Sequence, residues 1–473
     1  MNLVIIGGGA AGSQAALEAK KIDRSVEVTV VERQKVPQYS LCGLPYALSG
    51  EIPSFDDLVI FPFSFYQNRG IDLRLDTVAS AIAPKRKTIT LGSGEEIPYD
   101  SLIMATGASS KTLGIKGLDK KGVFYFRMIE DGWKISEYAK KCKRAIVVGL
   151  GLVALEAAVA LKKIGLDVTV VGRRPAPMRR LIDRDMGKLI IDHLRDRGVV
   201  FLLEHVVEEV IGEDEVKGVV TRGWKEGKTS DETGSLKTDM VIIACGIRPN
   251  TEIAQKAGIK TTPDGIIVDK YLETNVKGIY AAGDCALVSD FVTGKNIPSD
   301  LGTTAVRAGI AAGINALGGR HPFKPVLNVA ITELFDLVVG SLGLNKAKAT
   351  QNNLEFVEAK VKAGSRAEYY PGGKEIVIKL LSELGGRIIG GQIIGEEGVF
   401  SRIMALAFGV QHGMSIDDLA HSENCYTPPL SPVIDPLQIA ARVTIKKIER
   451  IERKERIAPK QAVAEGNHVG KKT

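Results

Sequence analysis

A glycine-rich turn between two apolar strands, at the start of the chain, constrains the fold more than any other feature. The run Leu3 to Ile6 leads into Gly7-Gly8-Gly9-Ala10-Ala11-Gly12, and a helical stretch to about Lys21, a strand from Val26 to Val31 and the acid Glu32 follow. This order is typical of a dinucleotide-binding strand, turn, helix, strand unit. We therefore predict a Rossmann-like parallel sheet at the N-terminus.

The residue types of this turn match what a dinucleotide requires. Gly7 makes the tight turn, Gly9 lets the backbone approach a pyrophosphate at the helix N-terminus, and Gly12 lets helix and strand pack closely. Glu32 is placed to accept a hydrogen bond from a ribose hydroxyl. Because the acid and both strands accompany the glycines, the motif is far more specific than the glycines alone.

The same pattern recurs in the middle of the chain. Ala145 to Val148 leads into Gly149-Leu150-Gly151-Leu152-Val153-Ala154, and a helix and the strand Asp167 to Val171 follow. Gly172 stands where the first unit has its acid, and Arg173-Arg174 come next. An arginine there can pair with a 2′-phosphate that a carboxylate would repel. Two units predict two nucleotides, and the second site should accept NADPH at least as well as NADH.

Three further apolar runs end in a glycine turn, at Gly107, Gly246 and Gly283. Open parallel sheets place ligands at such strand ends. Asp284 follows the last of these turns and precedes an expected helix from Gly302 to Leu317, whose N-terminus can stabilise negative charge on a reduced flavin ring. We predict a flavin contact for Asp284, the alternative being a turn or cap.

One cysteine lies ten residues past Glu32, in Ser40-Leu41-Cys42-Gly43-Leu44-Pro45-Tyr46. Proline is favoured in the first turn of a helix, so we expect a helix to begin near Pro45 and Cys42 to lie near its positive end. That position would lower the pKa of the thiol. We interpret Cys42 as a redox-active thiol facing a flavin, the alternative being a small buried hydrophobe.

Composition limits the other possibilities. The 473 residues are 44% hydrophobic and 25% charged, as in ordinary globular proteins of several domains. The five cysteines are scattered without a histidine cluster, which indicates neither a disulfide framework nor a metal site and favours a reducing cytoplasm. No basic leader or long apolar run precedes or interrupts the motifs, so we expect neither secretion nor membrane insertion.

The net charge of +7 comes mostly from the C-terminal tail, where residues 446–473 hold nine Lys/Arg and four Asp/Glu. Nucleic acid is therefore not an expected partner. Glu449 lies four residues before Arg453, which favours a solvated helix. We interpret the tail as a charged extension that is disordered from Pro459 onward, the alternative being a contact with a partner or an anionic surface.

In this order the motifs resemble the pyridine nucleotide-disulfide oxidoreductase superfamily over residues 1 to about 445. Cys42 to Tyr46 and the segment Cys425 to Pro436 resemble its single-cysteine branch, which comprises coenzyme A-disulfide reductases, NAD(P)H sulfur reductases and NADH oxidases. The resemblance implies an α/β fold with two Rossmann-like nucleotide-binding domains and an α+β dimerisation domain. The implied boundaries are 1–110 and 245–322 for the FAD domain, 111–244 for the NAD(P) domain, 323–445 for the dimerisation domain and 446–473 for the tail.

The resemblance also implies site residues. Cys42 would be catalytic together with Tyr426 and Tyr370, which the branch places near the reactive cysteine of the other subunit of a homodimer. The implied cofactor contacts for FAD and for NADPH or NADH are Gly7, Gly9, Ala10, Ala11, Gly12, Glu32, Arg33, Val78, Ala105, Thr106, Gly107, Gly149, Gly151, Val153, Ala154, Glu156, Arg173, Arg174, Gly246, Gly283, Asp284, Thr304 and Ala305.

Some residues depart from the superfamily. Ala47 stands where dithiol reductases carry a second cysteine, so no internal disulfide can form at that spacing. The first glycine loop lacks the histidine that peroxide-reducing members carry, which argues against a peroxide-reducing function. Gln38 replaces a serine common in the branch, and Cys425 beside Tyr426 is interpreted as a bystander. Lys20 and Lys21 match a stretch that coenzyme A-disulfide reductases use for substrate phosphates, or are simple helix C-terminal charges.

The sequence therefore predicts an FAD-dependent NAD(P)H oxidoreductase that reduces a small disulfide or polysulfide, coenzyme A disulfide among them, through Cys42. One alternative is an NADH oxidase that reduces oxygen. Another is a flavin-bound redox sensor that turns over slowly. A sensor needs no thiol at the position of Cys42, so this residue favours the enzyme.

Overall fold

The computed structural model describes residues 1–466, and the side chains of residues 1–454. The chain forms two compact units. The first comprises Met1–Pro177 and Ile191–Val326, and the second comprises Met178–Ile190 and the chain from Leu327 onward. The expected α/β class is confirmed, because the first unit holds two parallel sheets and the second an antiparallel sheet with helices. The boundaries of the predicted domains stay predictions.

The first parallel sheet has the strand order β20-β7-β1-β2-β3. Its central strand pairs with both neighbours so that Ile6, Val31 and Met104 end side by side. Leu3 and Ile5 face one hydrophobic core while Val4 and Ile6 face another, which is why the strand is apolar throughout. The strands are β1 (Asn2–Ile6), β2 (Glu27–Val31), β3 (Ile71–Arg74), β7 (Ser101–Met104) and β20 (Ile279–Ala281).

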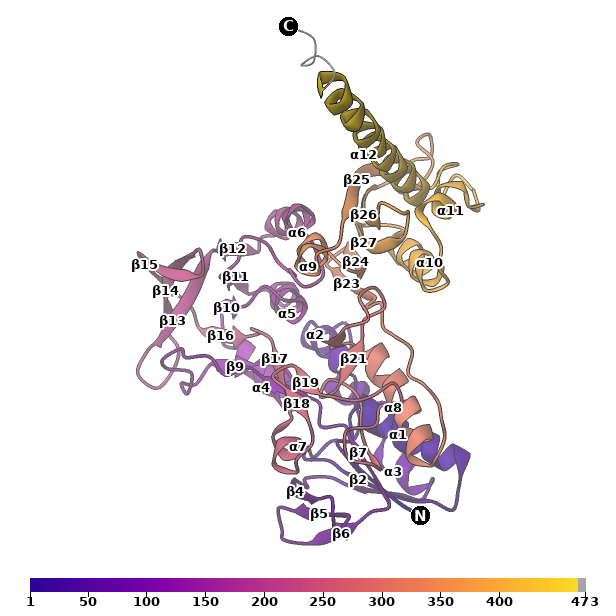
Figure 1. Cartoon of the computed structure of the whole chain (residues 1–473). Helices are drawn as coiled ribbons and strands as arrows, with labels where there is room; N and C mark the ends of the chain where they lie inside the picture. Colours follow the sequence, from indigo (N-terminus) through magenta and orange to yellow (C-terminus); the bar gives the residue numbers. More distant parts are fainter. Residues whose placement is uncertain (467–473) are drawn as a thin grey trace, which may run out of the picture. The chain divides into compact units, whose positions relative to one another are not determined.

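Two helices, α1 (Ala10–Ile22) and α8 (Gly302–Ala316), lie side by side on one face of this sheet (Figure 1). Small residues allow the close approach: a Cβ at Gly309 would lie 2.2 Å from the carbonyl oxygen of Ala11. Helix α1 begins just after the glycine turn that ends β1, and a Cβ on Gly283 would lie 3.8 Å from that of Ala305 in the first turn of α8, so both helices begin at the edge where the strands end.

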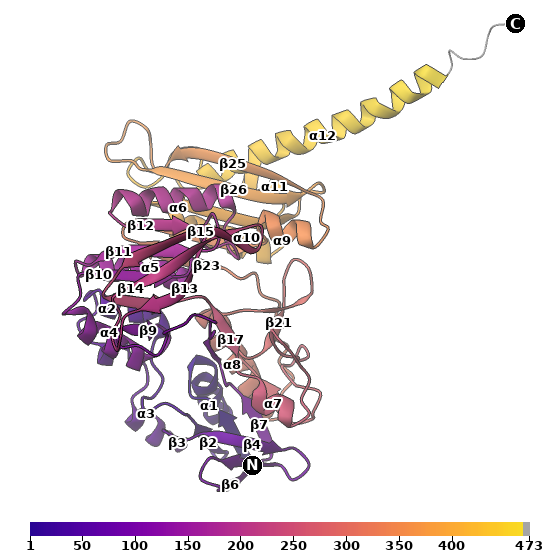
Figure 2. The ribbon, with the colours of Figure 1, turned by 90° about the vertical axis from the view of Figure 1, so that its left-hand side faces the viewer.

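The second parallel sheet has the order β12-β11-β10-β16-β9. A three-stranded antiparallel sheet, β13-β14-β15, is inserted between β12 and β16 (Figure 2). The elements are β9 (Val123–Tyr125), α4 (Ile129–Ala139), β10 (Arg144–Val148), α5 (Leu152–Lys163), β11 (Asp167–Gly172), α6 (Arg184–Asp196), β12 (Val200–Leu203), β13 (His205–Ile211), β14 (Gly218–Lys225), β15 (Lys228–Lys237) and β16 (Met240–Ile243).

Short elements complete the first unit. They are the 3-10 turns Leu41–Gly43 and Phe55–Leu58, helices α2 (Leu44–Leu48), α3 (Phe63–Gln67) and α7 (Glu252–Lys256), and strands β4 (Ala79–Ala83), β5 (Thr88–Leu91), β6 (Glu96–Pro98), β8 (Ala108–Ser110), β17 (Ile247–Pro249), β18 (Thr261–Thr262), β19 (Gly265–Ile266), β21 (Leu287–Ser289) and β22 (Asn296–Pro298).

The second unit is built on an antiparallel sheet of order β23-β24-β27-β26-β25. Helix α10 packs on β24 and β27, and α12 packs on β25 and β26. The elements are β23 (Ala330–Leu334), β24 (Leu337–Gly343), α9 (Lys346–Gln351), β25 (Phe356–Gly364), β26 (Glu375–Glu383), β27 (Ile388–Gly395), α10 (Val399–Gln411), α11 (Ile416–His421) and α12 (Pro436–Gly466).

A buried lysine fastens residues 178–190 to this sheet. The side chain of Lys379 is 5% exposed, and its Nζ lies 2.9 Å from Asp183, 3.0 Å from Asp185 and 3.2 Å from Glu358. Asp183 also exchanges two hydrogen bonds of 2.9 Å with the Gln392 amide, one through its own backbone N–H. Such a network is stable only while every charge keeps its partner.

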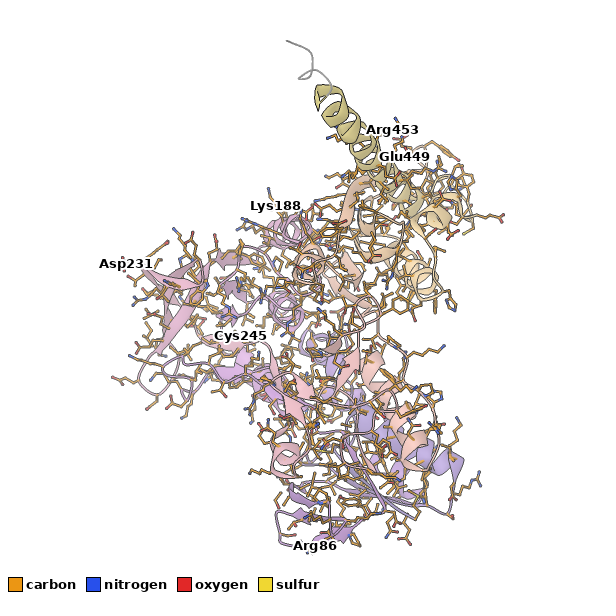
Figure 3. The ribbon with its side chains drawn as sticks, in the orientation of Figure 1. Arg86, Lys188, Asp231, Cys245, Glu449 and Arg453 are labelled. Carbon is orange, nitrogen blue, oxygen red and sulfur yellow. The ribbon has the colours of Figure 1, made fainter. Side chains whose placement is uncertain are left out.

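The C-terminal tail corrects one expectation. The helix expected around Glu449 and Arg453 is confirmed, and both residues lie on the exposed part of α12 (Figure 3). The disorder expected from Pro459 is wrong for residues 459–466, because α12 continues to Gly466. The neighbouring alanine, lysine and glutamine residues are good helix formers on both sides of Pro459, although the proline itself removes one backbone hydrogen bond. Residues 467–473 lie outside the described part of the chain.

Candidate active site

The first glycine turn has the geometry that its residue types predict. Gly7 has a φ of +106°, and a Cβ on it would lie 2.0 Å from the carbonyl oxygen of Ala105. A Cβ on Gly12 would lie 1.8 Å from the oxygen of Gly7, whereas one on Gly9 would meet nothing within 4 Å. Gly7 and Gly12 are therefore required because a side chain would not fit there. Gly9 leaves the backbone at the start of α1 open to a pyrophosphate.

Glu32 is held in place at the end of β2. Its side chain accepts hydrogen bonds from the N–H of Gly8 (2.6 Å) and of Gln34 (2.8 Å), and the residue is 7% exposed. The neighbouring Arg33 donates to Ser109 over 3.4 Å. Because each carboxylate oxygen keeps a free lone pair, the residue suits a ribose hydroxyl.

Other predicted flavin contacts gather at the same edge. A Cβ on Gly283 would lie 3.0 Å from that of Ala11 and 3.8 Å from that of Ala305. Thr106 donates to the carbonyl of Asn250 over 2.7 Å and precedes Gly107, whose φ is +63°. Ala10 and Thr304 belong to the first turns of α1 and α8, and Val78 follows Thr77, which donates its N–H to the carbonyl of Glu32 over 2.9 Å.

Asp284 has a partner that no motif marked. The guanidinium of Arg127, just before α4, donates to Asp284 over 2.7 Å, and the two side chains are only 22% and 15% exposed. The Arg127 backbone N–H in turn donates to Asp131 over 2.9 Å. The two residues are 157 positions apart in the sequence, so no local pattern predicts their contact.

Cys42 lies in a 3-10 turn directly before α2, and Pro45 stands in the first turn of that helix as expected. The expected lowering of the thiol pKa is wrong. Although the residue is partly exposed, surrounding protein atoms withdraw water from the thiol and raise its pKa; the charge of Glu156 raises it further and that of Arg127 opposes the increase. With only five residues, α2 has too small a dipole to reverse this.

The second glycine turn repeats the first. Gly149 has a φ of +134°, and a Cβ on it would lie 2.3 Å from the carbonyl oxygen of Ala244. A Cβ on Gly151 would meet nothing within 4 Å, and Ala154 is fully buried in the third position. Val153 is 41% exposed at the start of α5, which also carries Glu156. The same backbone is thus open at the start of α5.

A cysteine, Cys245, lies just after β16 and next to the second glycine turn. The Sγ of Cys245, which is labelled in Figure 3, donates to the carbonyl of Val148 over 3.1 Å, and Val148 directly precedes Gly149. Burial raises the pKa of Cys245 to about 11, and the nearby charge of Arg173 opposes that increase. Gly246 follows with a φ of +99°. Arg173 is therefore close to the turn that opens the second nucleotide site.

The space that an acidic side chain at position 172 would need is filled by Leu150. A Cβ on Gly172 would lie 2.2 Å from Cγ of Leu150, the middle residue of the second turn. In the first turn Gly8 holds the middle position, and Glu32 fills the space beside it. The first turn therefore pairs a glycine (Gly8) with an acid (Glu32), whereas the second pairs a leucine (Leu150) with a glycine (Gly172).

The predicted tyrosines lie on the second unit. Tyr426 is 43% exposed and shares a hydrogen bond between hydroxyl groups with Tyr369, which raises the pKa of Tyr426. Tyr370 is 38% exposed and lies beneath the Arg366 guanidinium instead. The structure thus pairs Tyr426 with a tyrosine that was not predicted, and the relation of Tyr426 and Tyr370 to a partner's Cys42 stays a prediction.

Comparison with known proteins decides the family. The profile described as Pyridine nucleotide-disulphide oxidoreductase matches residues 1–309, and that of the corresponding dimerisation domain matches residues 329–437. The chain belongs to this family. It is 39% identical over 455 residues to an NADH oxidase of Methanocaldococcus jannaschii, covering 95% of this chain and 99% of that protein.

Two further relatives are named for sulfur chemistry. The chain is 32% identical over 447 residues to an NAD(P)H coenzyme A polysulfide/persulfide reductase of Pyrococcus horikoshii, covering 93% of this chain and 98% of the relative. The solved structure of an NAD-dependent persulfide reductase from A. fulgidus matches with a TM-score of 0.90 and 36% identity, over 95% of this chain and 84% of that one.

Within the described residues, no helix combines the length and apolar character needed to cross a bilayer.

Proposed function

We propose that this protein is an FAD-dependent NAD(P)H oxidoreductase that reduces a small disulfide or polysulfide through Cys42. The surroundings of Cys42 carry the proposal. Helix α2, which follows the cysteine, packs against α5 of the second glycine unit, and Glu51 pairs with Lys163 of α5 over 2.7 Å. The Arg127–Asp284 pair marks the flavin edge of the first sheet. The position of the thiol beside elements of both glycine units supports the proposal.

The residues present suit FAD. The open backbone at Gly9 and the fixed carboxylate of Glu32 would hold its pyrophosphate and ribose, and Asp284 would contact its other end. When bound, FAD supplies the relay of an electron pair from NAD(P)H to sulfur. The second nucleotide would lie on Gly151, with Arg173 and Arg174 toward a 2′-phosphate.

The chain's own part in the reaction is thiol chemistry. The Cys42 thiolate attacks one sulfur of R–S–S–R, the S–S bond breaks, R–S⁻ leaves and takes up a proton, and Cys42–S–S–R forms. Two electrons then cleave that mixed disulfide into the Cys42 thiolate and a second R–S⁻. Arg127 favours the attacking thiolate, and Glu156 opposes it.

We further propose that the enzyme is a homodimer in which Tyr426 of one subunit donates a hydrogen bond to the leaving sulfur at the other subunit's Cys42. The dimerisation-domain match supports a homodimer. So do the exposed apolar residues of the second unit, among them Leu430 (74% exposed) and Val433 (63%). The five free cysteines suit a reducing cytoplasm.

Coenzyme A is one substrate class to consider, because relatives carry it in their names. The predicted phosphate contact at Lys20 gains no support, since this side chain donates to the carbonyls of Val26 (2.7 Å) and Arg24 (3.3 Å). Lys21 pairs with Glu18. Both lysines fit the simpler interpretation as charges at the C-terminus of α1.

Oxygen reduction is the second candidate, because the relative at 39% identity is named NADH oxidase.

Steady-state kinetics of the FAD-loaded protein with coenzyme A disulfide, polysulfide and oxygen separate the two functions. We expect sulfur substrates to be preferred and Cys42→Ser to abolish their reduction while FAD stays bound. Cys425→Ser is the matched control, since Cys425 is also exposed. Brisk oxygen reduction with no sulfur activity in the wild type would favour the oxidase.

A further inference from the structure

A tryptophan lies beside the arginine pair of the second nucleotide site. Trp224 is near the end of β14, in the antiparallel sheet inserted after β12. The guanidinium carbon of Arg173 lies 5.9 Å from the centre of its ring. Arg173 directly follows β11, so β14 brings the indole to the strand end where the fingerprint acid is missing. Neither the glycine pattern nor the chemistry at Cys42 uses this residue.

Two N–H groups at this place lack an acceptor. The indole Nε1 of Trp224 and the Nε of Arg174 are both buried, and neither forms a hydrogen bond within the part of the chain whose side chains are described. Buried donors in folded proteins are nearly always paired. Both groups therefore keep hydrogen-bonding capacity that the described residues do not use.

The charges point to an anion. Arg173 and Arg174 form no ion pair with a carboxylate of residues 1–454. The carboxylate that the first unit places at this position is absent, because Gly172 stands there. A guanidinium presents several donors to the oxygens of a phosphate, and an indole ring offers a flat face to a purine.

We propose that Trp224 forms one wall of the subsite for the adenosine 2′-phosphate end of NADPH, with its ring facing the adenine. Arg173 and Arg174 supply the donors for the 2′-phosphate. This inference rests on the proposed function, since it requires the second glycine turn to bind a pyridine nucleotide. Trp224 then governs affinity for any adenosine nucleotide, while the arginines govern the preference for a 2′-phosphate.

Calorimetric titration of the FAD-loaded, full-length protein with 2′,5′-ADP and with 5′-ADP separates these two roles. We expect the wild type to bind 2′,5′-ADP at least about tenfold more tightly than 5′-ADP. Trp224→Leu should weaken both ligands by about tenfold and keep their ratio, whereas Arg173→Ala should remove most of the ratio. Trp224→Phe should restore most of the affinity, because a phenyl ring also stacks.

Trp133 offers a matched control, because it is the other tryptophan of the chain and is 40% exposed on α4. Trp133→Phe should bind both ligands like the wild type, and the fluorescence of its remaining Trp224 should change on binding of 2′,5′-ADP. FAD content of each variant reports correct folding. Unchanged affinity of Trp224→Leu for both ligands, or unchanged fluorescence, would overturn the proposal. If the protein reduced no disulfide or polysulfide but bound both ligands as expected, the proposed function would be contradicted and the role of Trp224 in nucleotide binding would stand.

Discussion

The guanidinium of Arg127 lies 2.7 Å from the carboxylate of Asp284, so the segment just before α4 is tied to the turn that follows β20. Both charges act on the Cys42 thiol: that of Arg127 lowers its pKa and that of Asp284 raises it. Glu156 of α5 acts in the same direction as Asp284. These three charges, from distant parts of the chain, therefore modify a thiol pKa that the withdrawal of water has already raised.

These charges predict opposite shifts in two variants. Arg127→Met should raise the pKa of Cys42, and Glu156→Gln should lower it, because the first removes a positive charge and the second a negative one. The rate of alkylation by iodoacetamide against pH measures both shifts. The background should be Cys425→Ser, since Cys425 is exposed as well. Shifts of the same sign in both variants would contradict the assigned effects of the two charges.

The pairing of Leu150 with Gly172 predicts that one substitution will not convert the nucleotide preference. Gly172→Glu alone places a Cβ 2.2 Å from Leu150, so we expect weaker binding of both NADPH and NADH. The double variant Leu150→Gly, Gly172→Glu recreates the pair of Gly8 and Glu32. We expect it to shift the kcat/KM ratio toward NADH by about tenfold or more, since charge-assisted hydrogen bonds contribute about 1.5–3 kcal/mol.

A natural control for this experiment is Leu150→Gly by itself, which opens space without adding an acid. It should keep the wild-type ratio of NADPH to NADH. If the single and double glutamate variants behaved alike, the role given to Leu150 would be wrong.

Sequence reasoning worked at the glycine turns, because the spacing of the glycines is a signature of the turn that they form. Gly7, Gly12 and Gly149 lie at positions where a Cβ would collide with a carbonyl oxygen, and such constraints are visible in the glycine pattern itself. It failed at Cys42, because the protein atoms around the thiol and the charge of Glu156, which is far away in the sequence, outweigh the dipole of a five-residue helix. Arg127 was missed because its partner is 157 residues away.

Side-chain pairings were equally hard to foresee. Tyr369 and Tyr370 are neighbours in sequence, and only the turn that contains them decides which hydroxyl group reaches Tyr426. Trp224 lies in a strand whose pattern reveals no ligand, and its relation to Arg173 depends on the packing of one sheet against another strand end.

The tyrosine pair yields a third prediction. Tyr426→Phe should lower kcat/KM for disulfide reduction by about tenfold, because one hydrogen bond to the leaving sulfur is worth about 1–1.5 kcal/mol. FAD content should stay unchanged. Tyr369→Phe keeps the Tyr426 hydroxyl and should cost less, while lowering the pKa of Tyr426 toward its usual value. Equal losses in both variants would indicate that the pair acts only on local structure.

The buried charge network of the second unit predicts how stability depends on pH. Burial tends to raise the carboxyl pKa values of Asp185 and Glu358, but hydrogen bonds and charge from lysines, Lys379 among them, bring both below their ordinary values. A lowered folded-state pKa gives stability that is present above the unfolded-state value, about 4, and is lost as pH falls through the folded-state value. We therefore expect acid to remove the stability that the carboxylates around Lys379 contribute.

Lys379→Met tests that expectation, because it leaves Asp183 buried at 7% exposure without its cation. At pH 7 the free energy of unfolding should fall by about 3–5 kcal/mol. The difference from the wild type should shrink as pH falls from about 5 toward 3, since protonated carboxyl groups need no cation. Urea unfolding followed by circular dichroism measures both values. Lys362→Met, which removes an exposed lysine paired with Glu375, should change stability by less than about 1 kcal/mol at either pH, and a loss as large as that of Lys379→Met would refute the special role of the buried site.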